Sequence, residues 1–167
     1  MDLGFDVPQP HRLVGHAEAF KAYDHAEVFI SDGSIQLSLH PEMQLELQIN
    51  CSELDRQLSS LAQVCNPSFP LISTLEELKI WGDGRLSFSH WGDDVGGSQW
   101  LELLDPFTAL KNLYLTDKVA QHVCGALQGL SGERATEVLP ALRNLFVDGL
   151  RSFEHIQETI RPFVTAR

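Results

Sequence analysis

The residues best suited to catalysis lie in one stretch rich in Gly and Asp, residues 82 to 98. His90 directly follows Ser89 and stands three positions before Asp93. A hydroxyl, an imidazole and a carboxylate can serve as the nucleophile, base and orienting acid of a hydrolase. A catalytic triad needs rigid support, however, and a Gly-rich loop provides little. A hydrolase that uses His90 with Ser89 or Asp93 is therefore the alternative hypothesis, not the leading one.

The other groups that could bind a metal or a cofactor are scattered along the chain. No two of the seven His residues stand four positions apart, the spacing that places two ligands on one face of a helix. Cys51, Cys65 and Cys124 form no CxxC pair and are odd in number, which favours free thiols in a reducing compartment. We therefore expect no metal and no cofactor.

The charge balance limits the class of partner. The 167 residues include 12 Lys and Arg against 23 Asp and Glu, a formal net charge of -11. Nucleic acids and anionic membranes attract basic surfaces, so we expect neither as a partner, and a protein selected by charge would be basic. No apolar run reaches the roughly 18 residues of a membrane helix, and no signal sequence is evident. We expect an intracellular protein, cytoplasmic or nuclear.

The elements that must position any functional side chain follow from a repeated apolar pattern. Its three copies are Ile72, Leu75, Leu78 and Ile80; Phe107, Leu110, Leu113 and Leu115; and Leu139, Leu142, Leu145 and Val147. The copies end at positions 80, 115 and 147, which gives steps of 35 and 32 residues. The last two apolar residues of each copy are two apart and lie on one face of a strand. We predict three repeat strands; the alternative is an α/β domain whose core strands merely resemble one another.

The rest of the chain fits a single domain, residues 1–167, built around these strands. Residues 1–19 read as a lead-in, 20–50 as N-terminal strands with a hairpin, and 51–167 as strand–helix repeats. Asp32-Gly33 between apolar strands predicts a two-residue turn in which both residues have positive φ. Leu45, Leu47 and Ile49 predict a further strand, a partial fourth copy of the repeat. The repeat pattern also occurs in degraded form at Phe20, Tyr23, Ala26 and Val28, as an irregular first unit. Helices are expected from Ser52 to Asn66 and after residues 115 and 147.

The repeat carries a resemblance to a known family. The pattern Leu-x-x-Leu-x-Ile at residues 75–80 is similar to divergent leucine-rich repeats. Residues 106–115 and 137–145 resemble the C-terminal leucine-rich-repeat-like region of fungal, basidiomycete-type F-box-like proteins. The resemblance implies a short α/β solenoid of parallel strands and helices, capped here by the N-terminal hairpin. It also implies a non-catalytic substrate-recognition fragment, although this sequence has no recognisable F-box.

Strand alternation singles out a candidate interaction surface. If the repeat leucines face the helices, the residues between them face the other way. The predicted protein-binding residues are Lys79, Trp81, Tyr114, Thr116, Phe146 and Asp148. Aromatic and polar side chains together are typical of protein interfaces, although another segment could instead cover these aromatics as core. We therefore predict a non-catalytic protein-binding module; a second binding hypothesis is an acidic inhibitor of a basic protein.

The C-terminal end of the repeat array gives a further expectation. The unit at an open end of a solenoid exposes its apolar face unless an atypical segment caps it. Nothing comparable to the N-terminal hairpin follows the apolar residues Ile156, Ile160 and Phe163. We expect that this end either supports self-association or marks a piece of a longer repeat protein.

Overall fold

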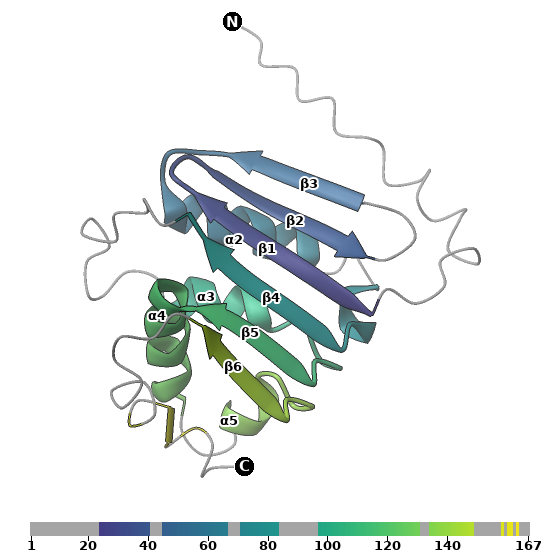
Figure 1. Cartoon of the computed structure of the whole chain (residues 1–167), viewed down its shortest axis with the longest axis vertical. Coiled ribbons are helices and arrows are strands. Elements are labelled where there is room, and N and C mark those ends of the chain that lie inside the picture. Colours follow the sequence, from purple (N-terminus) through teal and green to yellow (C-terminus); the bar gives the residue numbers. More distant parts are fainter. Residues whose placement is uncertain are drawn as a thin grey trace, which may run out of the picture.

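The computed structural model describes residues 24–40, 45–66, 71–83, 97–130 and 134–148, with residues 158, 160, 161 and 163. These residues form an α/β fold around one mixed sheet of six strands in the order β3-β2-β1-β4-β5-β6 (Figure 1). The strands are β1 (His25–Ser31), β2 (Ser34–His40), β3 (Leu45–Asn50), β4 (Glu77–Gly82), β5 (Asn112–Thr116) and β6 (Asn144–Asp148). β1, β2 and β3 pair antiparallel, whereas β1, β4, β5 and β6 run parallel. The expected α/β class and N-terminal hairpin are both confirmed.

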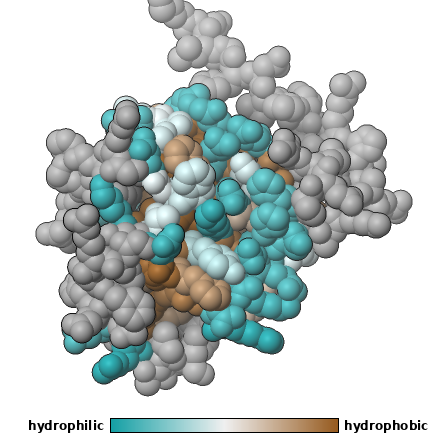
Figure 2. Space-filling model, in the orientation of Figure 1, coloured by the Kyte–Doolittle hydropathy of each residue, from teal (hydrophilic) through white to brown (hydrophobic). Residues whose placement is uncertain are grey.

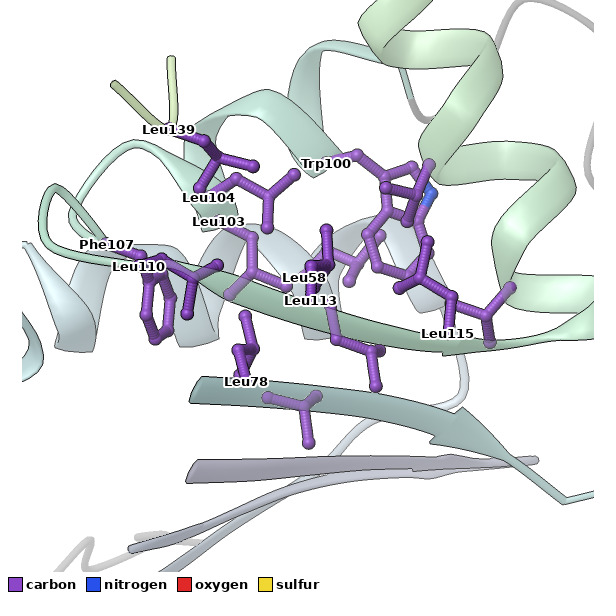
Figure 3. Packing of buried hydrophobic residues seen from close by; sticks show 14 of the residues in the cluster. Leu58, Leu78, Trp100, Leu103, Leu104, Phe107, Leu110, Leu113, Leu115 and Leu139 are labelled. Carbon is purple, nitrogen blue, oxygen red and sulfur yellow. The ribbon is translucent and has the colours of Figure 1, made fainter. Parts of the chain in front are cut away.

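The helices cover one face of this sheet (Figures 1 and 3). They are α2 (Leu54–Cys65), α3 (Gly97–Leu104), α4 (Asp117–Gln128) and the short α5 (Arg134–Glu137), with a 3-10 turn, η2 (Ile72–Thr74). α3 packs between α2 and α4, so the three longer helices form one continuous layer. Strands that alternate with helices and pair in parallel are what the repeat predicted.

The three repeat copies are aligned with one another across the sheet. Two rows of equivalent residues cross β4, β5 and β6: Leu78, Leu113 and Leu145, and Ile80, Leu115 and Val147. Equivalent residues before the strands also make contact, because Lys111 pairs with Glu76 and the backbone N–H of Arg143 donates to the carbonyl of Lys111. The steps in sequence are therefore also steps from strand to strand.

The buried side chains between the sheet and the helices form one apolar core (Figure 3). Leu78 and Leu113 from the strands meet Trp100 and Leu103 from α3, and all four are essentially inaccessible to water. Burial alternates strictly along β1 and β2, as expected for a sheet covered on one face only. No helix among the described residues lies on the opposite face of the sheet.

The third repeat copy is less buried than the first two. Leu113 and Leu115 of β5 are fully buried, whereas Leu145 and Val147 of β6 are only partly buried. β6 is the last strand of the described sheet and has a neighbour on one side only. The three copies are equivalent in sequence, but the copy on the edge strand β6 is less buried than the copies on β4 and β5.

Two expectations about the N-terminal strands need correction. Leu45 to Asn50 does form a strand, but β3 lies at the far edge of the sheet and is not the parallel neighbour of β4. That neighbour is β1, where Ala26 and Val28 stand beside Leu78 and Ile80, the alignment given by the degraded copy of the repeat. In the β1–β2 turn only Gly33 has positive φ, at 109°, so the turn is not the type in which both central residues do.

The start of α2 also differs from the sequence prediction. The helix begins after Glu53, which makes no side-chain capping bond but forms an ion pair with Arg56 at 2.7 Å. The buried face includes Gln57, whose Nε2 donates a hydrogen bond to the carbonyl of Cys51. Gln57 therefore faces the core, although the apolar stripe of this helix predicts that a polar residue at this position is exposed to solvent.

Several predictions fall on residues outside those described. They are the 1–19 lead-in, most of the 82–98 loop, and most of the helix expected after Val147. In that last segment Phe163 is helical and buried, and Ile160 is helical and partly buried. None of the helices in the described residues is sufficiently long and apolar to cross a membrane.

Candidate protein-interaction face

The helix-free face of the sheet carries all six predicted binding residues. We define the helix-free face as the side chains of β1 to β6 that point away from the described helices. Lys79, Phe146 and Asp148 are exposed there. Trp81, Tyr114 and Thr116 are partly exposed. The apolar residues between them are turned towards the helices, so strand alternation placed the six residues correctly.

A stacked aromatic pair marks the β5–β6 end of this face. The rings of Tyr114 and Phe146 are parallel within 11°, with centroids 4.5 Å apart, because the two residues are register partners in β5 and β6. Phe146 is 45% exposed and is the one large hydrophobic side chain that is exposed among the described residues. Figure 2 views the molecule from this side, and hydrophobic surface is visible over β6. Aromatic side chains are enriched in the surfaces through which proteins bind one another.

A second aromatic pair lies on β1 and β4. The ring centroids of Phe29 and Trp81 are 4.4 Å apart, with an interplanar angle of 44°. Lys79 Nζ stands 5.6 Å from the Trp81 ring centroid and 3.6 Å from a carboxylate oxygen of Glu27. Lys79 is also the register partner of Tyr114, so this ammonium lies between the two aromatic pairs.

Sequence reasoning missed the contribution of β1 to the face. Phe29 and Glu27 were not predicted as binding residues, although they alternate with the buried residues Ala26, Val28 and Ile30. That alternation was a usable signal for the side of the sheet. The degraded match of Ala26 and Val28 to the repeat pattern was a signal for adjacency to β4, because these two residues pair with Leu78 and Ile80.

Polar side chains occupy the row that lies towards the amino ends of the parallel strands. Asn144 Nδ2 donates to Asn112 Oδ1 at 2.8 Å, another contact between equivalent repeat positions. His25 stacks on His40 with ring centroids 4.8 Å apart. A hydrogen bond from His25 to Asp24 holds the pKa of that carboxyl below its ordinary value. This row can make hydrogen bonds to a partner but exposes little apolar surface.

The face is acidic on balance. Among its described strand residues, carboxylates stand at Glu27, Glu46, Glu77 and Asp148, while Lys79 contributes an ammonium. The Lys79 charge is also shared with Glu27. The local charge therefore has the same sign as the net charge of the chain. Such a face attracts positively charged groups and repels acidic ones.

The described residues contain no cluster of side chains arranged for catalysis. His90, Ser89 and Asp93 all lie outside them. The described His, Cys, Asp and Glu side chains include no group of three placed to hold a metal ion. The thiols of Cys65 and Cys124 are free and buried, and burial raises the pKa of each to about 12. These two thiols are core groups and not nucleophiles.

Comparison with known proteins adds no family to this description. No family model matches the chain, and neither a curated protein nor a solved structure shows significant similarity to it. The geometry and charge of the helix-free face are therefore the features that indicate a function.

Proposed function

We propose that the chain is a non-catalytic protein-binding module that contacts its partner through the helix-free face. The observation that carries this proposal is the stacked pair of Tyr114 and Phe146 on a sheet face without helices. Tyr offers a large apolar ring with a hydroxyl, and paired rings offer a rigid contact area that loses little entropy on binding. Charged groups at Lys79 and Asp148 flank the pair and provide a polar rim.

The finer architecture belongs to the same proposal. We infer a short, divergent leucine-rich-repeat-like solenoid in which β4, β5 and β6 are the repeat strands and the β1–β2–β3 segment is the N-terminal cap. Parallel pairing with strand-to-strand steps of 35 and 32 residues supports this reading. The contacts of Lys111 with Glu76 and of Asn144 with Asn112 support it further, because repeat proteins reuse equivalent contacts. Substrate recognition of the F-box-like kind is the role that such a module would have.

Charge favours a basic partner, and with it a second candidate function. Four carboxylates against one ammonium on the described strands of the face would attract Lys and Arg side chains. An acidic protein of this kind could act as an inhibitor by covering a basic surface on its target. Both functions predict association that weakens as salt rises, because exposed charges are screened over about 10 Å at 0.1 M salt.

Affinity capture with matched variants tests the proposal. The test protein carries Tyr114→Ala and Phe146→Ala, and the control carries Gln121→Ala and Gln128→Ala at exposed positions of α4. Proteins retained from a cell extract are identified by mass spectrometry with wild type, test and control chains. We expect specific partners that the control keeps and the test protein loses. Equal retention by all three chains would refute a role for the helix-free face.

A further inference from the structure

β6 is the edge strand at the C-terminal end of the described sheet. In the described part of the chain no strand lies beyond β6. The N–H of Asn144 donates towards β5, to the carbonyl of Lys111. Backbone groups alternate in direction along a strand, so those of Leu145 and Val147 point away from β5. An unpaired edge of this kind is a template for a strand from another molecule.

The side chains of β6 would direct what such a strand contains. Phe146 and Asp148 lie on the helix-free face, and Leu145 and Val147 lie on the helix side, where both are only partly buried. A strand added beside β6 places its own side chains alternately beside these two sets. Apolar residues would complete the cover of Leu145 and Val147. Basic residues on the other side would meet the Phe146 ring and the Asp148 carboxylate.

Charge favours a basic segment over a second copy of this chain. Two copies would each bring a net charge of -11 to the contact. An Arg side chain, in contrast, can stack on the exposed Phe146 ring and pair with Asp148, two interactions that the edge offers together. The opposite edge strand, β3, offers Glu46, Gln48 and Asn50 on this side and no aromatic ring. The two edges are therefore distinguishable.

We propose that β6 binds an extended segment of a basic partner as an additional strand, with apolar and basic residues alternating along it. The segment lies with its apolar residues over Leu145 and Val147 and its basic residues beside Phe146 and Asp148. This inference rests on the proposed protein-binding function and specifies the partner's chemistry and mode of binding. Backbone pairing would supply affinity, and the alternating side chains would supply specificity.

A synthetic peptide tests the proposal directly. The probe is capped Arg-Val-Arg-Val-Arg-Val-Arg, and the control is a capped peptide of the same composition with its four Arg residues followed by its three Val residues. Binding to the full chain is measured at physiological ionic strength by calorimetry, with amide hydrogen exchange read at Leu145 and Val147. We expect the alternating peptide to slow exchange of these two amides at least about 10-fold and to leave Gln48 of the other edge unchanged. Equal binding of both peptides would show charge attraction alone and overturn the proposal.

Backbone methylation of the peptide separates strand pairing from side-chain attraction. In an antiparallel pair the residues opposite Leu145 and Val147 donate to β6, whereas in a parallel pair the donors are their neighbours. N-methylation of all Val residues should therefore abolish binding if the peptide pairs antiparallel, and N-methylation of all Arg residues should abolish it if the peptide pairs parallel. In each case, N-methylation of the other set of residues should leave binding intact. Binding that survives both modifications would exclude backbone pairing.

The outcomes for this inference and for the proposed function can be told apart. If Phe146→Ala removes a cellular partner but the peptide fails to bind, the helix-free face still functions and the strand-addition proposal is wrong. If the peptide does not bind and Phe146→Ala leaves partner capture unchanged, both proposals fail. A wild-type chain that sediments as a dimer, with Leu145 and Val147 amides already protected, would show that a second copy occupies the edge and would also overturn the proposal.

Discussion

Replacing Leu113 with alanine tests whether the repeat leucines supply the core. Leu113 is fully buried on β5, between β4 and β6 and beneath the helical layer. The change removes three carbons beyond Cβ, and at about 0.8 kcal/mol each their transfer term is about 2.4 kcal/mol. A cavity term adds to this because strands on both sides limit collapse. We expect the free energy of unfolding to fall by about 3 to 4 kcal/mol.

Equivalent substitutions at other positions provide matched controls. Leu145 occupies the same repeat position on β6 but is partly buried and has a described strand on one side only. Leu145→Ala should therefore cost about half as much, roughly 1.5 to 2 kcal/mol, since water already reaches part of the side chain. Lys111→Ala removes only an exposed ion pair with Glu76 and should cost less than about 1 kcal/mol.

Urea unfolding followed by tryptophan fluorescence measures these differences. The midpoint and the slope are compared for wild type, Leu113→Ala, Leu145→Ala and Lys111→Ala, because a changed midpoint at constant slope reports a change in stability. Equal losses at Leu113 and Lys111 would refute the register. Equal losses at Leu113 and Leu145 would instead show that β6 is as well covered as β5.

Further predictions concern turns and thiols. Gly33→Ala should destabilise the fold by about 1 kcal/mol or more, because the backbone φ of Gly33 is 109°. Gly125→Ala in α4 should instead stabilise the fold by roughly 0.5 to 1 kcal/mol, because the space around a new Cβ is open. Thermal unfolding of both variants tests these predictions. In the native protein a thiol reagent should modify Cys51 first and reach Cys65 and Cys124 only after unfolding. The pKa of each buried thiol is about 12 in the folded protein, whereas the same thiols have a pKa near 9 in the unfolded chain. Their contribution to stability is therefore complete below about pH 9 and declines as the pH rises towards 12. Urea midpoints across this range should fall, and changing both buried cysteines to alanine should flatten the decline.

The strands were predictable because local patterns determine them. Period-two alternation identified the buried side of β2 and β3, and the repeat located β4, β5 and β6 with the correct residues aligned. The six candidate binding residues followed from the same alternation, since a residue between two buried ones must face the other way. These alternation patterns are local and do not depend on distant segments.

The remaining features depend on contacts between distant segments. The pairing of β1 with β4 joins residues about fifty positions apart, a longer step than those between the other repeat strands, because β2, β3 and α2 intervene. Only the degraded match of Ala26 and Val28 to the repeat pattern indicated this neighbour, and Phe29 was not assigned to the Trp81 pair. Gln57 was missed for a related reason: its burial depends on a hydrogen bond to the Cys51 carbonyl, which is formed only once the helix begins after Glu53.

The arrangement of this sheet separates the residues that maintain the fold from those that could contact a partner. A change at Leu78 or Leu113 opens the core and unfolds part of the chain, so its effect on binding says little about recognition. Lys79 and Phe146 are exposed on the opposite face and contribute little to the core. Changes there can alter binding while the urea midpoint stays nearly constant. Function at this face can therefore be tested by substitutions whose folding is checked independently, which is the condition that makes the binding proposals refutable.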